Sequence, residues 1–422
     1  MDTCTAEQAL RREAIRRLLQ GERPCDICRD LNRGRTWLHK WWSHYQLNPK
    51  TDFADRSRSP HTSPHQTPSS VEQVVIRVRR LLEAGQSPET RYGFVGHRAI
   101  RAELQRLGVK PLPSLATIQR ILAHHDLTHP RGAVADNAYY PELVGWAPNA
   151  IHATDIITKH LYGGQVVQNF HTFDHYTHAV FMSQHPDKQS ATVSTHLLGS
   201  WANLGIPVIE QMDNEDSFRG GHSHPRIIGK VVRLCLFVGV EALFIPEYEG
   251  RRNYWVEGFH SLWVEGFWSR ETFGELAKVR TEAPVFGRWY HRRYQPPSLE
   301  GKTPAQMRRG IETVRLTAAL RRLIPERLPI TRGRISLIRK VDTMEKVRVL
   351  NESWTVGRKW IGEYVWVIVD TAKQMITFWH KADEQSAWKE IKSRQYRLNE
   401  VVHPPLPEFR RNRSRCREQW PG

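Results

Sequence analysis

Three acidic residues in the middle of the chain are of a type that binds divalent metal ions. Asp155 ends an apolar run typical of a buried strand, and Asp213 ends a second such run. Glu257 follows Asn253, a plausible helix cap, and apolar residues recur around it at helical spacing. Carboxylates at two strand ends and on one helix can converge at one edge of a sheet. Hard cations such as Mg²⁺ and Mn²⁺ prefer these oxygen ligands.

The chemistry that such a site supports is phosphoryl transfer. Two metal ions roughly 4 Å apart can hold both the attacking and the leaving oxygen of a phosphodiester. Because carboxylates are common in any long chain, three acids alone are a weak signal. The residues around each acid make the signal stronger.

These local motifs resemble those of a known enzyme family. The matching stretches are Ala153-Thr154-Asp155-Ile156, Met212-Asp213-Asn214 with Ser217-Phe218, and Asn253-x-x-Val256-Glu257. They are similar to the catalytic core of insertion-sequence DDE transposases in the retroviral-integrase superfamily. The resemblance implies a ribonuclease H-like core in which Asp155, Asp213 and Glu257 are catalytic and hold two Mg²⁺ (or Mn²⁺) ions. It also implies DNA transposition, in which the phosphodiester at the element's ends is hydrolysed and the freed 3′-OH is joined to target DNA.

The same resemblance implies the partners of the protein. Double-stranded DNA is expected as the terminal inverted repeats and as the target, and a homo-oligomer would bring two ends together in a synaptic complex. The expected location is the prokaryotic cytoplasm, in association with the nucleoid. The alternative function is that of a catalytically silent, transposase-derived DNA-binding regulator.

Two other acids compete for places in the site. Asp174 stands between two expected strands, where aspartate is ordinary turn chemistry. The pentapeptide Trp-Val-Glu-Gly-Phe occurs twice, so Glu265 is a rival for Glu257. Glu265 lies eight residues further on, roughly 12 Å along a helix, so both cannot bind one metal pair. Asn253 and the expected helix start favour Glu257.

The chain departs from the family pattern at three points. Glu215-Asp216 follows Asn214 where the family has glycine, the gap between Asp213 and Glu257 is longer than usual, and Val264 stands where integrases often have a basic residue. We expect a phosphate contact from Arg251, Arg252 or Arg270 instead. None of these departures removes a metal ligand.

The overall charge of the chain points to a polyanionic partner. The 422 residues carry 62 Lys and Arg against 44 Asp and Glu, a formal net charge of +18. Such a balance favours nucleic acid, and phosphate contacts would make binding depend strongly on salt. No apolar run reaches the roughly 18 residues of a membrane span, and no signal segment is evident at the N-terminus. Five scattered cysteines make a disulfide framework unlikely and indicate a reducing compartment.

The first domain, residues 1–50, reads as a helix-turn-helix DNA-binding domain of three short helices. Its second and third helices would be joined by a turn at Gly34, and the third would lie in a major groove. The residues expected to face DNA are Arg33, Arg35, Thr36, His39 and Lys40. The simpler interpretation is that they form the solvated face of a small helical bundle.

A zinc site is the competing interpretation of the same region. Cys25-x-x-Cys28 followed by His39 and His44 nearly fits a zinc-finger spacing. However, helical periodicity already explains both cysteines as small apolar residues on the inner face of a helix. Zinc is therefore not expected.

The sequence patterns in the rest of the chain predict a multidomain α+β protein. A linker (51–70) leads to a second helix-turn-helix-like domain (71–127), whose recognition helix would present Ser114, Thr117 and Arg120 to DNA. After a second linker (128–149), the ribonuclease H-like catalytic core with a mixed sheet occupies residues 150–306. A linker helix (307–332), a small β-barrel (333–400) with period-2 patterning, and a basic tail (401–422) complete the chain.

Overall fold

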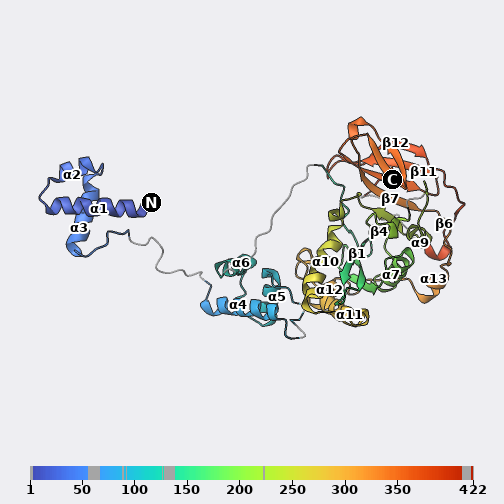
Figure 1. Ribbon diagram of the computed structural model, residues 1–422, viewed down its shortest axis with the longest axis horizontal. Helices are drawn as coiled ribbons and strands as arrows, with labels where there is room; N and C mark the ends of the chain where they lie inside the picture. Colours follow the sequence, from blue (N-terminus) through green and yellow to red (C-terminus); the bar gives the residue numbers. More distant parts are fainter. Residues whose placement is uncertain are drawn as a thin grey trace. The chain divides into compact units, whose positions relative to one another are not determined.

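The computed structural model divides the chain into two compact units, residues 1–66 and 67–422. It describes residues 3–55, 67–87, 90–91, 93–125, 127, 138–221, 224–410 and 420–421. Parts of the two expected linkers and of the basic tail lie outside these described residues. Figure 1 shows the helices and strands of each unit.

The first unit is a bundle of three helices, α1 (Thr3–Leu19), α2 (Pro24–Asp30) and α3 (Arg35–Leu47). Each of the three helices contributes to a small apolar core, which consists of Ala14, Ile27, Cys28 and Leu38. Cys28 is therefore a packing residue, as its helical position predicts. The turn between α2 and α3 contains Asn32, whose backbone adopts the left-handed conformation with φ 51°.

The second unit begins with three more helices, α4 (Ser69–Ala84), α5 (His97–Arg106) and α6 (Leu115–His124). Gly85 ends α4 with φ 56°, a left-handed conformation that glycine adopts without strain. Ser114 caps α6 by accepting a hydrogen bond from the backbone N–H of Thr117. The apolar faces of these helices pack on one another around Val75, Ile100 and Ile118.

The core is a mixed sheet with helices on both faces. Its strands are β1 (Ile151–His160), β2 (Val166–Asp174), β3 (Val180–His185), β4 (Ile209–Met212) and β5 (Glu241–Phe244). They lie in the order β3-β2-β1-β4-β5; β1, β2 and β3 are antiparallel, whereas β4 and β5 run parallel to β1. This is the expected arrangement of a ribonuclease H-like core.

Alternation along the strands decides which side chains face which helices. On one face, α7 (Ser190–Asn203) and α9 (Lys230–Val238) cover residues such as Met212 and Phe170. On the other face, α10 (Tyr254–Gly266) and α11 (Leu276–Arg293) cover Ala153 and Phe173. A short helix, α8 (Asp216–Arg219), and a 3₁₀ turn, η1 (Gly250–Asn253), lie in the connections between these elements.

The C-terminal strands are present, but they do not form a barrel of their own. Four of them, β7 (Arg334–Lys340), β10 (Tyr364–Asp370), β11 (Met375–His380) and β12 (Lys389–Gln395), continue the core sheet into one sheet of nine strands. The hairpin of β8 (Lys346–Val349) and β9 (Glu352–Thr355) is a separate two-stranded sheet. It packs on the extension through Trp354, whose ring lies 6.2 Å from that of Phe378 and 5.9 Å from that of Tyr396.

The physical reason is the free edge of β5. β7 pairs with it in parallel, placing Ala242 opposite Ile335 and Phe244 opposite Leu337. The Ser336 hydroxyl donates to the Glu241 carboxylate at 2.5 Å, so the junction also satisfies a buried acid. A sequence pattern of period 2 predicts the strands but not the edge with which they pair.

The expected linker helix over 307–332 is also incorrect. The structure has only α12 (Pro304–Met307), which begins just before this range, and α13 (Ala318–Arg322). Between them the backbone bonds to the core instead: the N–H of Leu316 donates to the carbonyl of Trp201, and the N–H of Ile206 donates to that of Val314.

The remaining elements are short. They are β6 (Ile330–Thr331) paired with β13 (Val402–His403), and the 3₁₀ turns η2 (Trp268–Arg270), η3 (Pro297–Leu299), η4 (Arg358–Trp360) and η5 (Pro407–Phe409). Within the described residues, none of the helices is both long and apolar enough to cross a membrane.

Candidate active site

Strand register brings Asp155 and Asp213 to neighbouring positions. Thr154 of β1 pairs with Met212 of β4, and each aspartate is the next residue along its strand direction. Parallel neighbouring strands lie about 4.8 Å apart, so the two side chains project from adjacent points of the sheet. By alternation they share the face of Ala153, which α10 covers.

Glu257 completes the group from the first turn of α10. The start of this helix is tied to β4, because the side chain of Gln211 donates to the Asn253 side-chain oxygen at 2.9 Å. Asn253 therefore does not cap the helix as the sequence predicts: its side chain makes no capping hydrogen bond and is used to anchor α10 to the sheet. A Cβ at Gly250 would lie 3.3 Å from the Glu257 carboxylate, so glycine leaves room beside it.

The three carboxyl groups act on one another electrostatically. The pKa of Asp155 is raised to about 7, first by burial and then by the charges of Asp213 and Glu257, while a hydrogen bond from the Ile156 N–H opposes the rise. Burial raises the pKa of Asp213 to about 6, and nearby Lys188 opposes this. The pKa of Glu257 is also raised by burial. An acidic cluster of this kind is short of positive charge, which a bound cation would supply.

The donor set fits divalent metal ions that bind few protein ligands. Within the described residues, no three His, Cys, Asp or Glu side chains are grouped so that they could hold one ion. Mg²⁺, however, commonly takes only one or two carboxylates and keeps several waters. Asp155 lies within electrostatic reach of both Asp213 and Glu257, so pairs of carboxylates are the available ligands. A cavity of about 420 Å³ lined by Asp213, Asn214 and Glu215 opens beside them.

The two additional acids after Asn214 have their own cationic partners. The Glu215 carboxylate forms an ion pair with Lys188, while its backbone N–H donates to Asp213 at 3.0 Å. Asp216 begins α8 and lies 3.8 Å from the guanidinium of Arg219. These contacts explain how the chain accommodates the departure from the family pattern.

Arg339 of β7 supports the loop that carries Asp213, a role that no sequence motif indicates. Its buried guanidinium donates to the Asn214 side-chain oxygen at 2.7 Å and to the Ile245 carbonyl at 2.8 Å. Asn214 in turn donates to the same carbonyl at 2.6 Å. The C-terminal extension of the sheet thus helps to position the candidate site.

Two histidines beside Asp155 were also not anticipated. His171 stands opposite Asp155 on β2. His260 lies one helical turn after Glu257, with its Nδ1 3.9 Å from the Asp155 carboxylate. Burial lowers the pKa of His260 to about 4, so it is neutral. The spacing Glu257-x-x-His260, which puts both side chains on one helix face, was the signal available in the sequence.

The rival acids lie elsewhere in the structure. Asp174 is fully buried at the end of β2, where it accepts a hydrogen bond from Thr177 at 2.6 Å and lies 3.3 Å from the guanidinium of Arg308. These contacts give it a structural role. Glu265 lines a different cavity, further along α10.

The arginines near the site differ in their contacts. Arg251 is exposed, and its charge lowers the pKa of Glu257 against the effect of burial. Arg252 donates to Glu249 and to the Tyr364 hydroxyl and stacks on Tyr140, so its guanidinium is engaged within the protein. Arg270 donates to backbone carbonyls of the α4–α5 segment, including that of Gly93 at 2.9 Å.

The expected DNA-facing residues are mostly on helix surfaces. Arg35, Thr36, His39 and Lys40 are exposed along α3. Arg33 is half-buried and bonds to Glu7 at 2.8 Å. On α6, Ser114 and Arg120 are exposed, and Thr117 is half-buried.

A chain of hydrogen bonds runs beneath the site, on the opposite face of the sheet from Asp155. Glu210 of β4 accepts from the Thr154 hydroxyl at 2.6 Å and from the Trp201 indole at 2.9 Å. From Thr154 the chain continues through Thr172, His196, Ser183 and His185, with distances of 2.5, 2.9, 2.7 and 2.8 Å. Burial raises the pKa of Glu210 to about 8, so this carboxyl group is largely protonated at neutral pH.

Glu210→Gln is expected to remove a pH-dependent loss of stability. The folded protein holds the proton on Glu210 up to about pH 8, whereas an unfolded glutamate releases it near pH 4.5. This stabilisation is therefore complete below about pH 4.5 and declines as pH rises, by at most about 1.4 kcal/mol per pH unit. Glutamine imitates the protonated form of glutamate. The free energy of unfolding of the variant, measured by urea denaturation, should therefore rise relative to that of the wild type from pH 5.5 to pH 8. A difference that stays constant with pH would contradict this.

Comparisons with known proteins found similarity only among solved structures. No protein-family model matches the chain, and no curated protein sequence matches it. Among solved structures, it is similar to the HTLV-2 integrase catalytic core domain in complex with magnesium, at 16% identity and a TM-score of 0.30 over 39% of this chain and 98% of that one. It is similar to a chain of the simian T-cell lymphotropic virus intasome in complex with PP2A regulatory subunit B56 gamma, at 14% identity and a TM-score of 0.35 over 74% of this chain and 100% of that one. The BIV integrase catalytic core matches at 12% identity and a TM-score of 0.29 over 38% and 93% of the two chains.

Proposed function

We propose that this chain is a DNA transposase that nicks DNA at the ends of a mobile element and joins the freed 3′-OH to target DNA. The observation that carries the proposal is the register of β1 and β4. It places Asp155 beside Asp213 at the sheet face on which α10 presents Glu257. Three coupled carboxyl groups in this arrangement suit metal-dependent phosphoryl transfer.

The residues of the chain would act by holding and positioning. Asp155, Asp213 and Glu257 would hold the divalent ions, which when bound supply positive charge to the attacking and leaving oxygens. The Ile156 N–H, which donates to Asp155 at 2.8 Å, fixes the orientation of that carboxylate. Arg339 fixes the loop of Asp213 through Asn214. Positioning of this kind contributes much of the rate in phosphoryl transfer.

Recognition of the element's ends would come from the helices outside the core. The exposed surface of α3 offers Arg35, Thr36, His39 and Lys40 to a major groove, and α6 offers Arg120 near its Ser114 cap. The net charge of +18 supplies the long-range attraction to phosphate. Joining two ends in one complex requires at least two copies of the chain, so we propose a homo-oligomer.

The test is a strand-joining reaction on labelled, pre-nicked DNA ends of the element, in Mg²⁺ and in Mn²⁺, with Asp213→Asn as the matched variant. We expect joined products from the wild type, none from the variant, and equal binding of both to the ends at low salt. Wild-type protein that binds the true ends but joins them in neither metal would instead indicate the DNA-binding regulator.

A further inference from the structure

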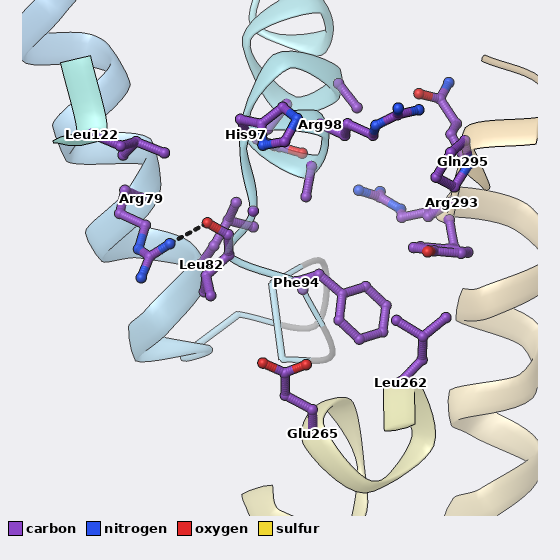
Figure 2. A pocket seen from close by; sticks show the side chains of 18 of the residues that line it. Arg79, Leu82, Phe94, His97, Arg98, Leu122, Leu262, Glu265, Arg293 and Gln295 are labelled. Carbon is purple, nitrogen blue, oxygen red and sulfur yellow. Dashed lines mark hydrogen bonds between the residues drawn. The ribbon is translucent and has the colours of Figure 1, made fainter. Parts of the chain in front are cut away.

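A second cavity lies between the helices α4–α6 and the core helices α10 and α11 (Figure 2). Its volume is about 760 Å³, within the roughly 300–1,000 Å³ typical of ligand sites. Three aromatic side chains form part of its wall: Phe94 has its ring 5.8 Å from that of Trp289 and 5.0 Å from that of Tyr294. Rings grouped in this way offer flat apolar surface to a ligand.

Four arginines line this cavity: Arg79, Arg98, Arg106 and Arg293. Arg79 and Arg106 are paired with Glu83 at 2.7 Å and with Glu103 at 2.6 Å. Arg98 and Arg293 have no acidic partner among the residues that the structure describes.

Within the described part of the chain, the guanidinium groups of Arg98 and Arg293 have neither an ion pair nor a hydrogen bond to another side chain. Figure 2 shows both on one side of Phe94 and Glu265 on the other side. The cavity therefore has a cationic end, an aromatic wall and the carboxylate of Glu265, while its other carboxylate, Glu103, is paired with Arg106. This combination matches a ligand that carries an anionic group, a flat ring and a hydrogen-bond donor.

We propose that this cavity binds an unpaired nucleotide of DNA. Arg98 and Arg293 would contact its phosphate, and its base would lie against Phe94 and Trp289 or Tyr294, as bases stack on aromatic side chains in single-strand sites. Glu265 would accept a hydrogen bond from an exocyclic amino group, as carboxylates do from N4 of cytosine. The proposal rests on the proposed function in that it takes DNA as the ligand.

The position of the cavity along α10 supports this ligand. Glu265 lies eight residues after Glu257 on the same helix, roughly 12 Å along its axis. That distance corresponds to about three or four nucleotides at 3.4 Å each. Gln119 of α6 also lines the cavity, and in the sequence it directly precedes the candidate DNA contact Arg120. A strand that passed from α6 to the acidic site would therefore run past this cavity.

A protein segment is the less favoured occupant. An apolar peptide side chain could pack on the aromatic wall. It would, however, cover the guanidinium groups of Arg98 and Arg293 without supplying a negative charge, and burying an unpaired charge is unfavourable. A nucleotide uses both features at once. A contact with a second copy of the chain is accordingly treated as an outcome of the test.

The test measures binding of the full chain to two fluorescent eight-nucleotide strands, one of oligo-dC and one with the same phosphates but abasic sugars. We expect the wild type to bind oligo-dC at least about fivefold more tightly, because base stacking is lost in the abasic strand. Arg98→Ser with Arg293→Ser should weaken oligo-dC binding about tenfold. Arg322→Ser with Arg321→Ser, on the exposed surface of α13, removes the same charge elsewhere and should change it less than twofold.

Photocrosslinking locates the base independently of affinity. A strand with one central 5-iodocytosine should form an adduct with a peptide that contains Phe94, Trp289 or Tyr294. Equal loss of binding in the two double variants, or adducts only in α1–α3, would overturn the proposal. So would unchanged oligo-dC binding with altered self-association in the Arg98 and Arg293 variant, since the cavity would then belong to a second copy. Strand joining is measured separately, so its failure would count against the transposase and not against this site.

Discussion

Asp155→Asn is expected to abolish strand joining while making the protein more stable. In the proposed mechanism this carboxylate helps to hold the divalent ions, so we expect the joining rate to fall by about a thousandfold or more. The same carboxylate is buried beside Asp213 and Glu257, which makes its charge unfavourable in the metal-free fold. Loss of activity and gain of stability in one variant would identify a group kept for chemistry and not for folding.

The stability effect has a definite dependence on pH. The pKa of Asp155 is about 7 in the folded chain, against an ordinary value of 3.8. Because the folded chain binds this proton more tightly than the unfolded chain, the protonated carboxyl group stabilises the folded state. This stabilisation is complete below about pH 3.8 and is lost as pH rises to 7. In EDTA, asparagine should therefore add at most about 4 kcal/mol to the free energy of unfolding at pH 8 and less at pH 5.

Asp174→Asn is the matched control, because it is the same change at another buried aspartate. Burial also raises the pKa of Asp174, but the hydrogen bond from Thr177 and the charge of Arg308 oppose the rise, so this replacement should add less to the stability at pH 8 than Asp155→Asn does. Denaturation by urea, followed by circular dichroism, measures both variants. An Asp155→Asn protein less stable than the wild type at pH 8 would show that the carboxylate contributes to folding.

The main features of the site were predictable from local patterns. Apolar runs that end in aspartate identify strands whose carboxylates reach one sheet edge, and helical spacing around Glu257 identifies the third element. Asp213 directly follows β4, as this pattern predicts, but Asp155 lies in the middle of β1 and not at its end. The register of the two strands nevertheless brings the two residues side by side. The electrostatic effects within the site could not be predicted in this way. The raised pKa of Asp155, for example, depends on burial, which only the packed structure reveals.

The residues that support the site were not predictable in the same way. Arg339 reaches Asn214 only because β7 pairs with β5, a contact between segments far apart in the sequence. Period-2 patterning predicts that β7 is a strand, but it does not predict with which strand β7 pairs. Similarly, Thr154, Thr172 and Glu210 look like scattered polar residues in apolar strands, and only the sheet joins them into one hydrogen-bonded chain.

Removing residues 330–422 is expected to unfold the core, because the C-terminal strands are part of its sheet. The truncation would expose the edge of β5, leave Glu241 without the hydrogen bond from Ser336, and remove Arg339 from the loop of Asp213. It would also uncover apolar side chains on both faces of the sheet, among them Leu243 and Phe244. An exposed apolar edge of this kind favours aggregation.

The comparison that tests this uses two fragments. Residues 67–422 keep the whole nine-stranded sheet and should unfold in one cooperative thermal transition, since the first unit has its own core. Residues 67–329 should be insoluble or show no cooperative transition by calorimetry. If the shorter fragment instead melts cooperatively, the strands from β7 to β12 are an independent domain docked on the core. The site of Asp213 would then be complete without Arg339, and its loop would have to be ordered by the bound metal and DNA alone.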